Sequence, residues 1–130
     1  MRSWYRGIPL HSIFLLAALS LIGCAGITGS GEEEPAWVAA LIRQMEAEPV
    51  SNPPAFVARY EYRGGRVYYV PPRCCDVPGT LYDASGTVLC HPDGGLTGAG
   101  DGRCSDFFTE RRNEKIVWRD RREWRGPSAG

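Results

Sequence analysis

The sequence lacks the features that mark most enzymes and nucleic-acid-binding proteins. It has two histidines, of which only His91 lies beyond the first 24 residues, so any Ser–His–acid set would depend on it. The phosphate-loop pattern G-x-x-x-x-G-K-[ST] and the dinucleotide-binding pattern G-x-G-x-x-G between strand and helix are both missing. Fifteen Lys and Arg residues balance 15 Asp and Glu residues, so no excess of positive charge indicates nucleic acid. We therefore predict a protein that is not an enzyme and binds no nucleic acid.

A long apolar run is also missing. A membrane-spanning helix needs about 20 apolar residues, and the longest apolar stretch, at 13–22, is shorter. It follows Arg2 and Arg6 and precedes Gly23, which is the order of a basic region, an apolar region and a cut site in a signal peptide. Leu21-Ile22-Gly23-Cys24 resembles a bacterial lipobox, which implies cleavage after Gly23 and a lipid on Cys24. The alternative is an ordinary signal peptide with an incidental cysteine.

The N-terminal quarter of the chain is therefore expected to be a leader and an anchor. Residues 1–23 would be a lipoprotein signal peptide, and residues 24–34 a lipidated cysteine with a flexible tether rich in Gly, Ser and Glu. Several acyl chains, such as palmitate, anchor a protein stably where one chain is marginal. Ala25 stands where an Asp would retain a lipoprotein in the inner membrane, so resemblance to that sorting rule favours the outer membrane. We predict an anchored domain that faces the periplasm and contacts an envelope protein or a peptidoglycan-associated partner.

The rest of the chain predicts a small α+β domain over residues 35–124, with a disordered tail at 125–130. Apolar residues at helical spacing follow Pro35, and Pro49 stops the pattern, which predicts a helix over 35–47. Alternating residues and turn signals predict strands at 55–63, 66–70, 80–83 and 87–89, a helical turn near 105–110 and a last strand at 115–118. We expect the helix to pack on an antiparallel sheet of four to five strands.

Turn residues predict how the first strands pair. Gly64-Gly65 suits a two-residue turn, which would place Tyr60 opposite Tyr69. The side of the strand that carries Tyr60 and Tyr62 is the better core face, although a strand pair this aromatic could also be a binding surface. Residues 84–86 suit a three-residue turn between the third and fourth strands.

Four cysteines, Cys74, Cys75, Cys90 and Cys104, remain once Cys24 carries a lipid. An even number in a small exported domain predicts disulfides. Adjacent residues of an extended strand point to opposite faces. We therefore expect two disulfides, from Cys74 and Cys75 to Cys90 and Cys104, in an order that the sequence leaves open. A bond between the neighbours Cys74 and Cys75 would close a strained ring and is discounted. A metal site or a thiol-redox pair is the alternative.

A glycine-rich loop lies between Cys90 and Cys104. Asp93, Asp101 and Asp106 would offer oxygen ligands to calcium, or contacts to another small ligand, although no EF-hand pattern is present. The other interpretation is a chain of tight turns, which the access of glycine to positive φ allows. His91 is expected to be a surface residue at the end of a strand.

The cysteine segment carries one longer pattern. It reads Cys74-Cys75-Asp76, Leu81-Tyr82-Asp83, Gly86 and then Cys90-x-Pro92-x-Gly94-Gly95-x-Thr97-Gly98-x-Gly100-Asp101-Gly102-x-Cys104-x-Asp106-Phe107. This pattern resembles a family of small bacterial lipoprotein domains of unknown function, over about residues 36–118 and most strongly over 74–107. The resemblance implies a fold and an envelope location, and it brings no activity and no catalytic residue. We expect a non-enzymatic binding or interaction module, with a calcium- or small-ligand-binding module as the alternative and an enzyme third.

Overall fold

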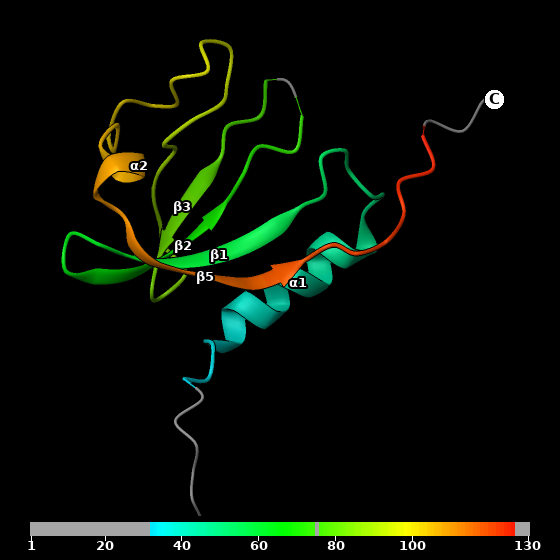
Figure 1. The fold of residues 1–130 in the computed structure, drawn as a ribbon, viewed down its shortest axis with the longest axis horizontal. Coiled ribbons are helices and arrows are strands. Elements are labelled where there is room, and N and C mark those ends of the chain that lie inside the picture. The colour runs from blue at the N-terminus through cyan, green and yellow to red at the C-terminus, as the bar shows by residue number, and fades with distance from the viewer. Residues whose placement is uncertain (1–31, 75, 127–130) are drawn as a thin grey trace, which may run out of the picture. The chain divides into compact units, whose positions relative to one another are not determined.

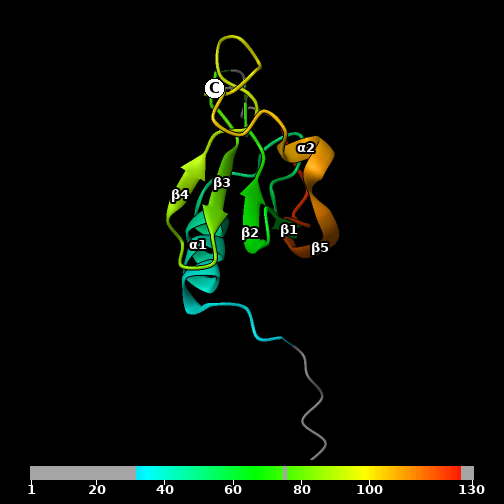
Figure 2. The ribbon, with the colours of Figure 1, turned by 90° about the vertical axis from the view of Figure 1, so that its left-hand side faces the viewer.

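The computed structural model describes residues 32–74 and 76–126, and these form one helix-and-sheet domain. Its elements are α1 (Ala36–Ala47), β1 (Phe56–Tyr62), β2 (Gly65–Val70), β3 (Thr80–Asp83), β4 (Val88–Cys90), α2 (Phe107–Glu110) and β5 (Arg112–Arg119). The strands form one antiparallel five-stranded sheet in the order β4-β3-β2-β1-β5, with β4 and β5 at opposite edges (Figure 2). The predicted α+β fold, with one main helix on an antiparallel sheet, is confirmed.

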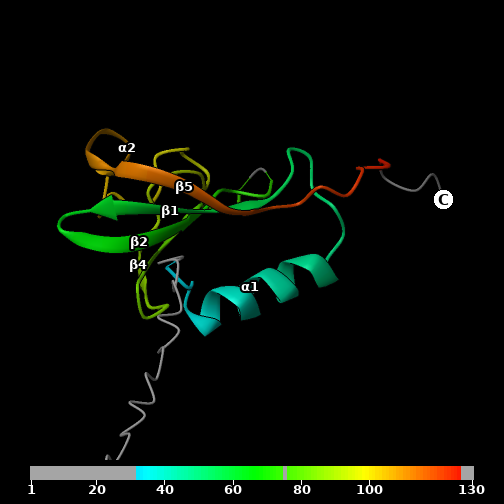
Figure 3. The same ribbon diagram turned by 60° about the horizontal axis from the view of Figure 1, so that its bottom comes forward.

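The helix α1 covers one face of the sheet (Figures 1 and 3). Its residues Val38 and Met45 are buried against Val57 of β1 and Tyr68 of β2, and Val38, Val57 and Tyr68 are fully inaccessible to solvent. These side chains fall on one stripe of the helix because residues seven apart return to the same face. This stripe is the face that the spacing of apolar residues predicts for 35–47.

Trp37 attaches the start of α1 to the turn between β3 and β4. Its indole Nε1 donates a hydrogen bond to the carbonyl oxygen of Ala84 at 3.0 Å, and its ring meets Tyr68 edge-on with the ring centres 5.1 Å apart. Gly86 lies under the same ring with φ of 89°, and a Cβ there would come within 2.8 Å of the indole. Gly86 is therefore required both by the backbone conformation and by the space that Trp37 takes.

The opposite face of the sheet packs against Cys104 and α2. Phe107 of α2 is fully buried, and its ring packs against Tyr60, Tyr62 and Tyr69 with centre-to-centre distances of 5.4–5.5 Å. The side that carries Tyr60 and Tyr62 is thus buried, as the alternation of residues predicts. Since α1 packs on the other side, β1 and β2 bury residues on both faces of the sheet, whereas most of the edge strand β5 is exposed.

The pairing of β1 with β2 differs from the prediction. The two turn residues are Arg63 and Gly64, with φ of 49° and 76°, and Gly65 is the first residue of β2. Tyr60 consequently pairs with Val67 and not with Tyr69. A tight hairpin of this kind needs positive φ at two consecutive positions, and Arg63 supplies the first of them in place of Gly65. The shift is two residues, so every side chain keeps its predicted face.

The chain after β5 returns to the C-terminal end of α1. Asp120 is 5% exposed, its amide donates to the carbonyl of Ala55 at 2.9 Å, and its carboxylate accepts hydrogen bonds from Arg122 Nε at 2.9 Å and Nη2 at 2.7 Å. Arg122 in turn donates to the carbonyl of Glu46 at 2.8 Å and to that of Glu48 at 3.2 Å. The last carbonyls of a helix have no partner inside it. Arg122 therefore caps α1 from a distant part of the chain.

Several predicted features lie outside the described residues. These are the signal peptide at 1–23, the lipidated Cys24, the tether up to residue 31, Cys75, and residues 127–130 of the tail. Over 32–74 and 76–126, none of the helices has the length and apolar character needed to cross a membrane.

Candidate functional site

A single disulfide closes the base of the loop that follows β4. Cys90, the last residue of β4, is bonded to Cys104, with the two Cα atoms 6.2 Å apart and both residues 2% exposed. The prediction that Cys74 and Cys75 pair with Cys90 and Cys104 is therefore wrong. Tight turns fold the chain after Cys90 back on itself, so the two ends of the loop meet and their cysteines face each other. One disulfide is described where two were predicted, and Cys75 lies outside the described residues.

Glycines make the turns inside this loop. The amide of Gly94 donates to the carbonyl of Gly98, and the amide of Gly100 donates to that of Gly94, both at 3.1 Å. Gly94 and Gly100 have φ of 73° and 67°. A Cβ at Gly94 would lie 2.8 Å from Pro72, and one at Gly100 would overlap the carbonyl oxygen of His91. The interpretation of the loop as a series of tight turns with positive φ is confirmed.

Two of the three predicted calcium ligands hold parts of this loop in place. Asp93 Oδ2 accepts a hydrogen bond from the hydroxyl of Tyr69 at 2.7 Å, while its Oδ1 is buried and has no hydrogen-bond partner within 32–74 and 76–126. The Asp101 carboxylate accepts from the backbone amides of His91 and Arg103, each at 3.0 Å. These amide hydrogen bonds, with that from Arg103 the strongest influence, hold the pKa of Asp101 below its ordinary value.

The third predicted ligand, Asp106, lies on the far side of Cys104 and faces the β1–β2 hairpin. The structure does not bring the three aspartates together: in the described part of the chain, no three His, Cys, Asp or Glu residues form a group that could hold a metal ion. Calcium binding by Asp93, Asp101 and Asp106 stays a prediction.

His91 lies just after β4, as predicted, and has a structural contact. Its Nδ1 is 2.8 Å from the carbonyl oxygen of Gly79, so Nδ1 carries the proton and donates it to that oxygen. His91, Asp76 and Asp101 line a hollow of about 400 Å³, and Leu96 on its rim is 89% exposed. The histidine side chain thus joins the segment before β3 to the disulfide-closed loop.

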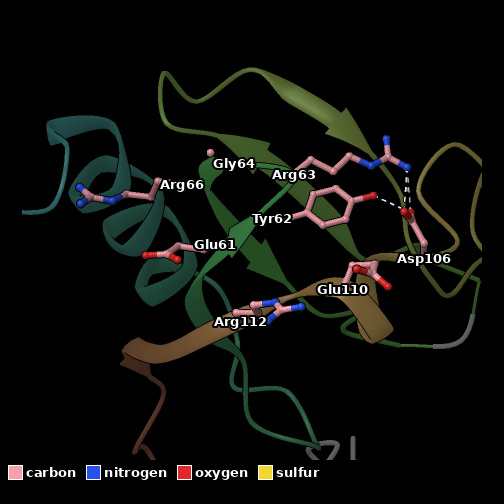
Figure 4. Close-up of a pocket in the computed structure, with 9 residues that line it drawn as sticks. Glu61, Tyr62, Arg63, Gly64, Arg66, Asp106, Glu110 and Arg112 are labelled. Atoms are coloured by element: carbon pink, nitrogen blue, oxygen red, sulfur yellow. Dashed lines mark hydrogen bonds and ion pairs between the residues drawn. The ribbon is translucent and has the colours of Figure 1, made fainter.

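A second and more polar hollow lies at the end of the β1–β2 hairpin, and we call it the hairpin hollow (Figure 4). It encloses about 590 Å³. Its walls come from the hairpin, α2 and the first residue of β5. They comprise Glu61, Tyr62, Arg63, Gly64, Gly65, Arg66, Asp106, Glu110 and Arg112. Acidic and basic side chains therefore surround one concave surface on a hairpin that packs against the core.

Three residues of the hairpin hollow hold one another. Tyr62 donates its hydroxyl to Asp106 Oδ1 at 2.6 Å, and Arg63 Nη2 donates to both carboxylate oxygens at 2.9 Å (Figure 4). Burial, together with the hydrogen bond to the carboxylate, raises the pKa of Tyr62. The hydrogen bonds from Tyr62 and Arg63 lower the pKa of Asp106. At neutral pH the group is therefore a neutral phenol and a guanidinium on one charged carboxylate.

Two other charged residues of the hairpin hollow are available to a ligand. Glu110 of α2 and Arg112 of β5 lie along one side of the hollow in Figure 4. Within residues 32–74 and 76–126, neither side chain has a hydrogen bond or ion pair. Glu110 can accept hydrogen bonds from an ammonium group, and Arg112 can donate two to a carboxylate or phosphate. The arrangement suits binding of a charged group.

Sequence reasoning did not single out the hairpin hollow. Its residues come from three segments that only the folded chain brings together. The sequence does contain one indication of this hollow, because Arg63 and Arg66 flank the turn glycines and functional residues concentrate in loops and turns. Asp106 was named as a calcium ligand, and its partners Tyr62 and Arg63 were not predicted.

Comparison with known proteins adds a family and no activity. A family model described as "Domain of unknown function (DUF6970)" matches residues 43–120. No curated protein and no solved structure matches the chain. The match agrees with the expected membership in a family of uncharacterised domains, while the lipid anchor and the 74–107 pattern stay predictions.

Proposed function

We propose that this chain, which belongs to the DUF6970 family of domains of unknown function, is a non-enzymatic binding module that takes a charged partner in the hairpin hollow. The observation that carries the proposal is the presence of two side chains of opposite charge, Glu110 and Arg112, on the wall of a concave surface and without partners among the residues that the structure describes. Both side chains are exposed, and ordering them on binding would cost about 0.5–1.5 kcal/mol each, which their ion pairs with the partner have to offset. Such a surface favours a partner that carries both a cationic and an anionic group.

The surroundings of the hollow support a binding role. Tyr62 and Arg63 are fixed on Asp106, so this wall is already organised before a partner arrives. Phe107 beneath them is fully buried and holds α2 against the sheet. Preorganised walls of this kind favour affinity because less order has to be imposed on binding.

The module would act in the bacterial envelope. The lipobox-like sequence before Cys24 supports lipidation there, and the Gly- and Ser-rich residues after it support a short tether to the outer membrane. Labelling of cells with radioactive palmitate tests this anchor. We expect label on the unaltered chain and none on Cys24→Ser. Equal labelling of the two would reject the anchor.

Site-specific crosslinking in intact cells tests the hollow. Gly65 lines it, has an ordinary φ, and a Cβ there would have no contact closer than 3.9 Å, so a photoreactive side chain fits at that position. We expect a crosslinked partner from position 65 and a different result from Gln44, an exposed residue of α1. The double substitution Glu110→Gln and Arg112→Gln should reduce the adduct at position 65 at least fivefold. Adducts that are the same at both positions, or unchanged by the double substitution, would contradict a binding role for this hollow.

A further inference from the structure

The residues just before α1 are fixed on the sheet by their side chains. Glu32, Glu33 and Glu34 lie outside any helix or strand and lead into α1. Glu32 and Glu34 both reach strands of the sheet. Glu33 is exposed, and in the described part of the chain its side chain has no hydrogen bond or ion pair.

Glu34 is held by side chains from three strands. Its Oε1 accepts hydrogen bonds from Arg59 Nη1 of β1 at 3.0 Å and from Lys115 Nζ of β5 at 3.2 Å. Its Oε2 accepts one from the hydroxyl of Tyr68 of β2 at 2.7 Å. Burial by itself would raise the pKa of Glu34, but the hydrogen bonds from Tyr68 and Lys115 outweigh it and the pKa is lowered. The carboxylate therefore stays charged where it is largely removed from water.

Glu32 is held by two arginines. Arg59 Nη2 donates to Glu32 Oε2 at 3.0 Å, so the two ends of one guanidinium bind two different carboxylates. Arg66 of β2 forms a hydrogen-bonded ion pair with Glu32 Oε1. The Arg59 side chain is only 14% exposed, whereas the Glu32 side chain is 54% exposed. The basic partners thus belong to the sheet, and the acidic ones lie on its surface.

We propose that Arg59, Arg66, Lys115 and Tyr68 form a receptor for an acidic peptide, and that the chain's own 32–34 segment occupies it as an internal ligand. Three cations from three neighbouring strands repel one another unless anions lie between them, so this part of the sheet requires an acidic occupant. Two carboxylates spaced two residues apart in a peptide fit the positions that Glu32 and Glu34 fill. The receptor therefore recognises acidic side chains at i and i+2.

The internal ligand can be displaced. Ion pairs near the surface contribute about 0–1 kcal/mol each, and salt screens them. Competition from the segment is strong mainly because it is part of the same chain, which corresponds to an effective concentration on the order of millimolar. A partner with a longer acidic segment would bind once the internal segment leaves. This inference uses a different surface from the hairpin hollow and stands without it, although Arg66 also lines the hollow.

The test opens the receptor in the full chain and offers it a peptide of residues 29–35 that carries a rhodamine label. Fluorescence anisotropy is measured at low salt with the unaltered chain, with Glu32→Gln/Glu34→Gln, and with Glu33→Gln as the matched control. We expect the doubly substituted chain to bind the peptide at least tenfold more tightly than the other two. Adding Arg59→Gln to it should weaken binding at least tenfold, and 0.5 M NaCl should do the same.

Two results would overturn the proposal. One is equal peptide binding by the doubly substituted chain and the Glu33→Gln control. The other is binding that the loss of Arg59 leaves unchanged. If Arg59→Gln lowers the melting temperature, Lys115→Gln gives the same test from the exposed edge strand, where its side chain is 49% exposed. A peptide with glutamine in place of its first and third glutamates should fail to bind, and equal binding by that peptide would also reject the carboxylate receptor.

Discussion

Replacing Phe107 with alanine should lower the free energy of unfolding by about 3–5 kcal/mol, the range for a buried Phe→Ala change. Phe107 is fully buried and meets the rings of Tyr60, Tyr62 and Tyr69 at 5.4–5.5 Å. Aromatic pairs of this geometry contribute about 0.5–1.5 kcal/mol each beyond the apolar area they bury. The residues around Phe107 belong to a sheet and a disulfide-closed loop, so they cannot collapse easily into the space. The loss should therefore fall in the upper part of the range.

Urea unfolding followed by intrinsic fluorescence measures this loss, because a small domain with its disulfide intact is expected to unfold in one transition. The neighbouring substitution Phe108→Ala is the matched control. Phe108 has the same chemistry and also contacts Tyr69, but it is 40% exposed. Its loss should be below about 1.5 kcal/mol, in keeping with partial burial. Phe107→Leu should recover much of the stability because it refills most of the volume.

The result that would refute the reasoning is a similar loss for Phe107→Ala and Phe108→Ala. It would mean that α2 does not close the second face of the sheet as a packed layer. The hairpin hollow would then lose its support, since Asp106 immediately precedes α2 and is the carboxylate that Tyr62 and Arg63 hold.

Three further predictions concern the disulfide-closed loop and a buried phenol. Replacing Cys90 and Cys104 together by serine should lower the free energy of unfolding by about 3 kcal/mol in the chain-entropy model. The urea midpoint should fall accordingly, and an unchanged midpoint would contradict a stabilising role of the disulfide. Gly100→Ala should lower the melting temperature more than Gly102→Ala does. Both glycines have positive φ, but only at Gly100 would the new Cβ overlap backbone atoms. Equal falls in melting temperature would contradict this loop geometry. Burial, together with the hydrogen bond to the Glu34 carboxylate, raises the pKa of Tyr68 to about 12. The unfolded value is about 10, so the stability that Tyr68 contributes is present below that pH and lost as pH rises towards 12. Urea midpoints compared between pH 8 and 11.5 test this, and Tyr68→Phe should flatten the decline.

The hairpin hollow and the acidic-peptide receptor share one side chain, Arg66. It lines the hollow and also pairs with Glu32 of the segment before α1. A partner that draws Arg66 into the hollow would remove one of the two arginines that hold Glu32. The two surfaces are therefore linked through a single residue, and Arg66→Gln should weaken binding at both.

The sequence by itself was enough for the local elements. Proline at each end of α1, alternation along β1 and β2, and turn glycines predicted the helix, the hairpins and the α+β class, because these signals depend on neighbours a few residues apart. The positive φ of the loop glycines was also predictable, since few other residues adopt that conformation. The anchor at Cys24 is likewise a matter of local sequence and stays a prediction.

Only the tertiary structure decided which distant residues meet. Four cysteines allow several pairings, and the fold of the 91–103 loop selected Cys90 with Cys104. The register of the first hairpin depends on the positive φ of Arg63, and this conformation in turn depends on how the strands twist in the finished sheet. Both proposed binding surfaces gather charges from β1, β2 and β5, and the hairpin hollow adds α2. No spacing along the chain encodes such groups, because side chains far apart in sequence become neighbours only once the strands pair.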